Sequence, residues 1–97
     1  IKGVAITDHN TLGGYFQVRK LASVYEDLVV LPGIEISTEK GDIIILGVEE
    51  KPEYPMTLNS AIEFAKATDG VIVIPHPYRS MGIGDSAMNI DAHAIEI

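Results

Sequence analysis

Histidine is scarce in this chain, and two of its three histidines stand where a short apolar run gives way to polar residues. His9, preceded by Asp8, follows one such run, and His76 follows another. Glu35 follows a third run after a Pro-Gly pair. In parallel α/β folds the carboxyl ends of the strands share one edge, where side chains distant in sequence meet. Imidazole and carboxylate groups without sulfur suit zinc, manganese or iron, so these residues predict a metal site.

Each of these residues, taken alone, also has a simpler interpretation. A histidine after a strand often hydrogen-bonds loop backbone, and residues 8–11 (Asp-His-Asn-Thr) have the composition of a helix-capping loop. Glu35, between two isoleucines, fits the solvent face of a strand. We interpret the carboxylates of residues 42–53 as a solvated surface and His93 as structural or exposed. Only the combination, at three predicted strand ends, favours a metal site.

Strand-like and helix-like segments alternate along the chain and must position these side chains. The apolar patterns predict helices over residues 12–27 and 57–68, the second capped by Thr57. A further short helix is predicted near Asp85 or Ser86. Strands are predicted over residues 3–7, 28–31, 42–48, 71–74 and 94–97. The alternation predicts an α/β fold with a parallel sheet, and the uncovered last strand suggests part of a larger domain.

Composition excludes several classes of protein. The 97 residues carry a net charge of −7 with only two arginines, which argues against binding to a long phosphate backbone. The absence of cysteine excludes disulfides, cysteine-ligated zinc and thiol nucleophiles. No apolar run is long enough to span a bilayer, so we expect no membrane partner and a cytoplasmic location. The sequence does not begin with Met, which leaves its true start open.

The order of the motifs carries a resemblance to a known family. Four segments are involved: Ile-Thr-Asp-His-Asn-Thr at 6–11, Leu-Pro-Gly-Ile-Glu-Ile-Ser at 31–37, Ile-Pro-His-Pro-Tyr-Arg at 74–79 and Ala-Ile-Glu-Ile at 94–97. Together they resemble the PHP (polymerase and histidinol phosphatase) family of metal-dependent phosphoesterases. The resemblance runs across essentially the whole chain.

The resemblance implies a fold and a set of roles. The fold would be a distorted (β/α)7 TIM-like barrel of parallel β/α units, with residues 1–97 as the central portion of a single domain truncated at both ends. His9, Glu35 and His76 would bind two or three divalent ions (Mn, Zn or Fe), with Glu35 bridging two of them. Asp8 would be the catalytic residue, as a ligand or a base beside the metal, and Arg79 would contact the substrate phosphate. The full-length protein would hydrolyse phosphate esters by a metal-bound hydroxide.

The sequence also departs from the family pattern. The opening H-x-H motif and the closing D-x-H motif are missing, as truncation would explain. Ile44 stands where many members carry a histidine before a Leu-Gly pair, which suggests fewer metals or an altered ligand set.

Three functional hypotheses follow. The leading one is a phosphoesterase whose substrate is a small phosphate ester or a nucleotide rather than a long nucleic acid. The second is a non-catalytic PHP-like domain with a partly lost metal set, acting as a scaffold or regulator. Ile44 favours this second hypothesis, whereas retention of all three predicted metal ligands opposes it. An unrelated α/β domain is a third hypothesis, which the family order of the motifs opposes.

Overall fold

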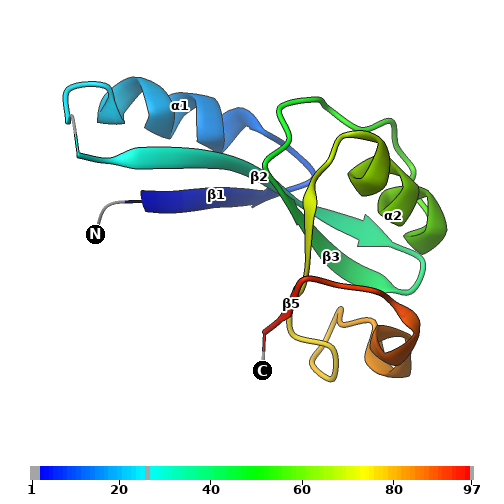
Figure 1. Ribbon diagram of the computed structural model, residues 1–97. Helices are drawn as coiled ribbons and strands as arrows, with labels where there is room; N and C mark the ends of the chain where they lie inside the picture. The colour runs from blue at the N-terminus through cyan, green and yellow to red at the C-terminus, as the bar shows by residue number, and fades with distance from the viewer. Residues whose placement is uncertain (1–2, 26, 97) are drawn as a thin grey trace.

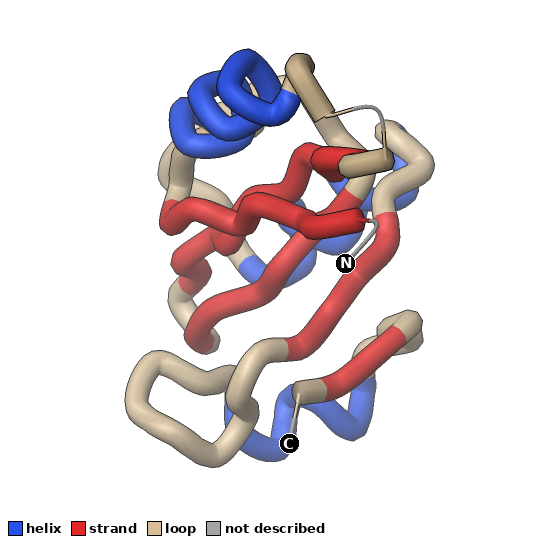
Figure 2. The backbone as a smooth tube through the Cα atoms, turned by 90° about the vertical axis from the view of Figure 1, so that its left-hand side faces the viewer, coloured by secondary structure: helices blue, strands red, loops and turns tan. Residues whose placement is uncertain are grey.

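Five strands form one mixed sheet in which the strand order follows the chain order (Figure 1). The computed structural model describes residues 3–25 and 27–96. The strands are β1 (Gly3–His9), β2 (Val29–Thr38), β3 (Gly41–Leu46), β4 (Val71–Ile74) and β5 (Ala94–Ile95). The helices are α1 (Gly13–Ala22), α2 (Leu58–Ala67) and a 3-10 helix, η1 (Gly84–Asn89). Figure 1 and Figure 2 both place α1 and η1 at opposite ends of the molecule.

The pairing of the strands overturns the predicted barrel of parallel β/α units. β1 pairs with β2 and β4 with β5 in parallel, but β3 is antiparallel to both of its neighbours. The described chain is therefore a small α+β domain with a mixed sheet, not part of a TIM-like barrel. The physical reason is the short turn at residues 39–40, because a turn of this length joins only antiparallel strands.

Local elements match the sequence predictions better than their pairing does. The strands predicted at 3–7 and 71–74 and the helix predicted at 57–68 are confirmed, while the predicted helix 12–27 is shortened to α1. The strand predicted to stop at residue 31 instead runs through Pro32-Gly33 as β2. The predicted strand 94–97 is present as β5, with residue 97 outside the described part of the chain.

Isoleucines at alternate positions of the central strands form the core. Ile36 of β2 lies opposite Ile43 of β3, and Ile34 lies opposite Ile45, which in turn lies opposite Ile72 of β4. Ala61 and Ala65, one turn apart in α2, join the same cluster. Since successive side chains of a strand point to opposite faces, this packing directs the intervening residues of β2 and β3 to the other face.

Thr57 caps α2 in a capping box. Its hydroxyl accepts a hydrogen bond from the Ser60 backbone N–H (3.0 Å), and the Ser60 hydroxyl accepts one from the Thr57 N–H (2.8 Å). We expect Thr57→Ala to lower the free energy of unfolding by about 1 kcal/mol, because an N–H of the first turn loses its partner. Calorimetric melting should show the loss, whereas Asn59→Ala, on the exposed side of the same turn, should not. Equal melting temperatures for the two variants would contradict the capping role.

Within the described residues, no helix combines the length and the apolar character needed to cross a membrane.

Candidate metal centre

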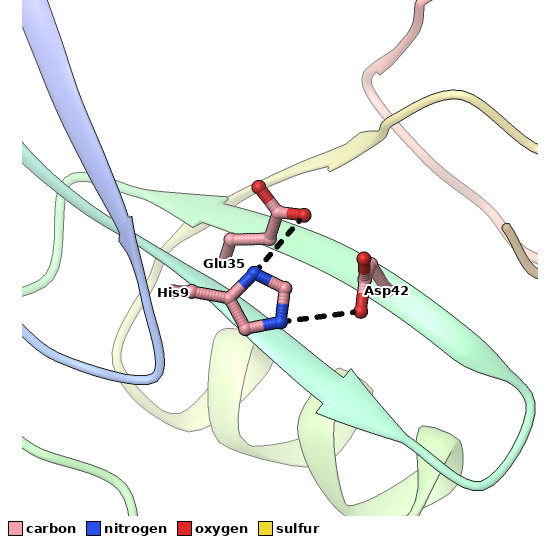
Figure 3. Close-up of side chains that lie close together, drawn as sticks. All are labelled: His9, Glu35 and Asp42. Atoms are coloured by element: carbon pink, nitrogen blue, oxygen red, sulfur yellow. Dashed lines mark ion pairs between the residues drawn. The ribbon is translucent and has the colours of Figure 1, made fainter. Parts of the chain in front are cut away.

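Three side chains from three strands meet on the face of the sheet opposite the isoleucine core (Figure 3). Strand register places His9 of β1 beside Glu35 of β2. The His9 Nδ1 atom lies 3.5 Å from Glu35 Oε1, and its Nε2 atom lies 3.5 Å from Asp42 Oδ1 of β3. One ligand atom from each residue can be chosen so that all lie within 4.8 Å of one another. We call these residues, with His76, the histidine–carboxylate cluster.

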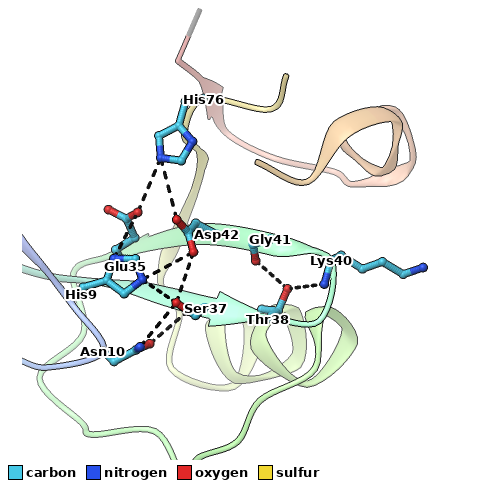
Figure 4. Close-up of polar contacts among 9 residues, drawn as sticks. All are labelled: His9, Asn10, Glu35, Ser37, Thr38, Lys40, Gly41, Asp42 and His76. Carbon is cyan, nitrogen blue, oxygen red and sulfur yellow. Dashed lines mark hydrogen bonds and ion pairs between the residues drawn. The ribbon is translucent and has the colours of Figure 1, made fainter. Parts of the chain in front are cut away.

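His76 approaches the same two carboxylates from the loop that follows β4 (Figure 4). Its Nε2 atom lies 3.6 Å from Glu35 Oε1 and 3.9 Å from Asp42 Oδ2. Its Nδ1 atom is buried and is the one such side-chain nitrogen or oxygen without a hydrogen-bond partner in the described part of the chain. The imidazole is therefore directed toward the carboxylates by the loop, not by a hydrogen bond at its other nitrogen.

Two glycines allow the His76 loop to pack against the β2–β3 turn. A Cβ atom added at Gly41, whose φ is +130°, would lie 2.5 Å from the carbonyl carbon of Gly82. A Cβ atom at Gly82 would overlap the carbonyl oxygen of His76. The Asp42 N–H donates to the Met81 carbonyl (2.7 Å) at the same contact. This close backbone approach fixes the position of His76 relative to Asp42.

Asn10 and Ser37 hold the end of β1 and orient His9 (Figure 4). The Asn10 side chain accepts a hydrogen bond from the Ser37 N–H (3.0 Å), and the Asn10 N–H donates to the Glu35 carbonyl (2.7 Å). Asn10 has a φ of +56°, a conformation that asparagine tolerates better than most residues. Its side chain thus hydrogen-bonds to β2 and does not cap α1, the role that its position after β1 suggests.

The surroundings of His9 also constrain which of its nitrogens can bind a metal. Asp42 and the Ser37 hydroxyl lie on the Nε2 side of the ring, whereas Glu35 lies on the Nδ1 side. A metal-bound imidazole uses one nitrogen as ligand and donates the N–H of the other, often to a carboxylate. One of the two carboxylates is placed to accept that hydrogen bond.

The electrostatics of the cluster favour a cation. Burial raises the pKa of Glu35, and the hydrogen bond and charge of Asp42 raise it further, against the lowering effect of His9 and His76. Asp42 is only 2% exposed. Within the described residues, no lysine or arginine forms an ion pair with either carboxylate. Two close carboxylates that have imidazoles but no lysine or arginine beside them are the arrangement that a bound metal ion would stabilise.

The distances between the potential ligand atoms are close to those found in a metal site. Ligand atoms at the bond lengths of a tetrahedral zinc site are about 3.4 Å apart. The separations of 3.5 and 3.6 Å from Glu35 to the two imidazoles are close to this value. The residues present therefore fit a divalent metal with mixed nitrogen and oxygen ligands.

The structure brings three of the five predicted site residues into the cluster: His9, Glu35 and His76. Asp8 does not join them, because strand alternation turns it to the other face, where its carboxylate occupies the space left by the missing side chain of Gly14. Arg79 is exposed, and it lines a cavity that His76 also lines.

Sequence reasoning missed Asp42, because the interpretation of residues 42–53 as a solvated carboxylate surface is wrong for this residue. The turn at residues 39–40 is the signal that would have identified it, since a tight hairpin pairs Ser37 with Asp42 on the face that carries Glu35. His93 is structural, as interpreted, because its Nδ1 atom accepts a hydrogen bond from the Ile72 N–H (3.0 Å).

Comparison with known proteins identifies one similar chain without assigning an activity. No family model matches the sequence. The chain is 35% identical over 99 residues to an uncharacterized protein of Methanocaldococcus jannaschii. The alignment covers 100% of this chain and 57% of that protein, so the chain spans little more than half the length of its curated relative.

Proposed function

We propose that this protein hydrolyses phosphate esters with the help of divalent metal ions, as its resemblance to the PHP family implies. One observation carries the proposal. Four potential ligands from four separate segments converge on one face of the sheet: His9, Glu35, Asp42 and His76. A set of two imidazoles and two carboxylates is typical of manganese, zinc and iron sites.

Each member of the cluster has a distinct part in the proposal. Glu35 Oε1 lies between the two imidazoles, 3.5 Å from His9 Nδ1 and 3.6 Å from His76 Nε2, so Glu35 would hold a metal ion together with either histidine. Ile44 stands where many members of the family carry a histidine, and Asp42, two residues earlier on the same face of β3, would supply a ligand in its place. When bound, the metal supplies Lewis-acid polarisation of the phosphate ester and lowers the pKa of an attacking water. Arg79, which lines the same cavity as His76, would neutralise charge on the phosphate.

The proposal is tested by metal content and hydrolysis together. The natural polypeptide, purified without chelator, should contain a stoichiometric amount of manganese, zinc or iron by elemental analysis. It should hydrolyse p-nitrophenyl phosphate, and Glu35→Gln should lose both the metal and the activity. Glu63→Gln, an exposed position on α2, is the matched control and should retain both. Activity in Glu35→Gln equal to that of the control would refute the assignment.

A second candidate function is a non-catalytic PHP-like domain that acts as a scaffold or regulator. Ile44 favours it, because this residue lies directly opposite Glu35 in the sheet and shares its face. An apolar side chain there offers no ligand where many members of the family carry one. A folded protein that contains no metal and takes up none from added salts would support this second candidate.

A further inference from the structure

We propose that the cavity beside His76 binds the organic half of the substrate and selects phosphate esters that carry a planar aromatic ring. The inference rests on the proposed function, because it assigns the substrate class of the same site.

The cavity adjoins the histidine–carboxylate cluster through one shared side chain. It has a volume of about 390 Å³ and is lined by His76, Pro77, Tyr78, Arg79, Ile95 and Glu96. This volume lies within the range of cavities that bind small molecules. His76 directs Nε2 toward Glu35 and Asp42 and also lines the cavity. A ligand in the cavity is therefore adjacent to the proposed metal ligands.

Tyr78 supplies an aromatic surface that is exposed yet held in place. The side chain is 69% exposed, but its hydroxyl donates a hydrogen bond to Asp85 Oδ1 (2.9 Å) in η1. This hydrogen bond also raises the pKa of the Tyr78 hydroxyl. A ring tethered in this way loses little conformational entropy when a ligand stacks on it. Ile95, which is 54% exposed, adds apolar surface to the same cavity.

Arg79 supplies the complementary charge for the phosphate. It is exposed and forms no ion pair with any other residue that the structure describes. A guanidinium group binds phosphate oxygens through two parallel hydrogen bonds. The lining thus combines one cation and one carboxylate, Glu96, with aromatic and aliphatic surface. Arg79 and the metal ions of the proposed site would hold a charged phosphate, and the aromatic and aliphatic surface matches a flat apolar group. A purely polar alcohol, such as glycerol, would leave that surface unused.

Binding of two phosphonates that cannot be hydrolysed tests the inference without measuring activity. By calorimetry on the metal-loaded protein, phenylphosphonate should bind about tenfold more tightly than methylphosphonate, since stacking on an aromatic side chain is of this order. Tyr78→Ala should remove this preference, and Asp85→Ala, which releases the ring, should reduce it. Tyr25→Ala, at an exposed tyrosine in the segment that follows α1, is the control and should leave the preference unchanged.

The outcomes separate this inference from the proposed function. Equal binding of the two phosphonates, or an undiminished preference in Tyr78→Ala, would overturn aromatic selection but leave phosphate-ester hydrolysis standing. Failure of both phosphonates to bind a metal-loaded protein would overturn both proposals. The aromatic ring of the substrate could be a nucleobase or an aryl group bonded near the phosphorus, and binding of adenosine 5′-thiomonophosphate distinguishes these two cases. Tighter binding than phenylphosphonate would indicate a nucleobase, and weaker binding would indicate an aryl group close to the phosphorus.

Discussion

Replacement of Asp42 by asparagine should abolish tight metal binding while leaving the metal-free protein at least as stable as the wild type. Asp42 is nearly fully buried, and its charge is one of the causes of the raised pKa of Glu35. Without a metal the two carboxylates repel one another, so an amide in place of Asp42 relieves the repulsion. The asparagine oxygen can still accept the hydrogen bond that the Ser37 hydroxyl donates to Asp42.

The same substitution removes a charged oxygen from the proposed ligand set. Loss of a metal ligand should weaken the affinity by about 100-fold or more, since even groups that only orient ligands contribute 10- to 100-fold. In the wild type, metal at 100 times its dissociation constant should add about 2.7 kcal/mol to the free energy of unfolding. For a domain of this size that corresponds to a rise of roughly 10–20 °C in the melting temperature.

Thermal melting of chelator-treated protein with and without added zinc or manganese measures both effects. Asp42→Asn should start at or above the wild-type melting temperature and gain almost nothing from metal. Glu63→Gln, an exposed carboxylate on α2, should behave as the wild type in both conditions. A full metal-induced gain in Asp42→Asn would exclude Asp42 from the ligand set. A large destabilisation of the metal-free variant would instead assign Asp42 a structural role.

Replacement of Ile45 by alanine should cost about 2–5 kcal/mol of unfolding free energy. Ile45 is fully buried at the centre of the sheet, where it lies opposite Ile34 on one side and Ile72 on the other. Alanine would leave a cavity that the three surrounding strands cannot close without shifting. Because domains of this kind are stable by only about 5–15 kcal/mol in total, the variant should approach the limit of folding.

Urea denaturation of the metal-free protein provides the measurement. Ile45→Val should lose only about 0.5–1.5 kcal/mol, since a single methylene is removed. Leu21→Ala removes more side chain than Ile45→Val but from a residue that is 75% exposed, so it should change the stability least. If Leu21→Ala and Ile45→Ala lost equal stability, the assignment of the core to this face of the sheet would be incorrect.

Local patterns in the sequence were sufficient to predict most of the elements. The apolar run of β4 and the amphipathic pattern of α2 with its Thr57 cap depend on neighbouring residues, and both lie where predicted. The parallel barrel was wrong because the alternation of strand-like and helix-like segments does not determine the direction in which neighbouring strands pair. The turn at residues 39–40 forces β3 to run antiparallel to β2.

For the candidate site, too, some features follow from the sequence and others from the tertiary structure alone. The sequence by itself placed His9 and His76 at the ends of apolar runs, because such runs form strands and polar residues follow them. Glu35, predicted at a strand end, instead lies within β2. Only the tertiary structure decided which polar side chains share a face. Register and alternation bring Asp42 beside Glu35 and turn Asp8 toward α1. β1 and β2 are separated by a helix in the chain, whereas β2 and β3 form a hairpin, and in both pairs a shift of one residue in register would turn these side chains to the other face.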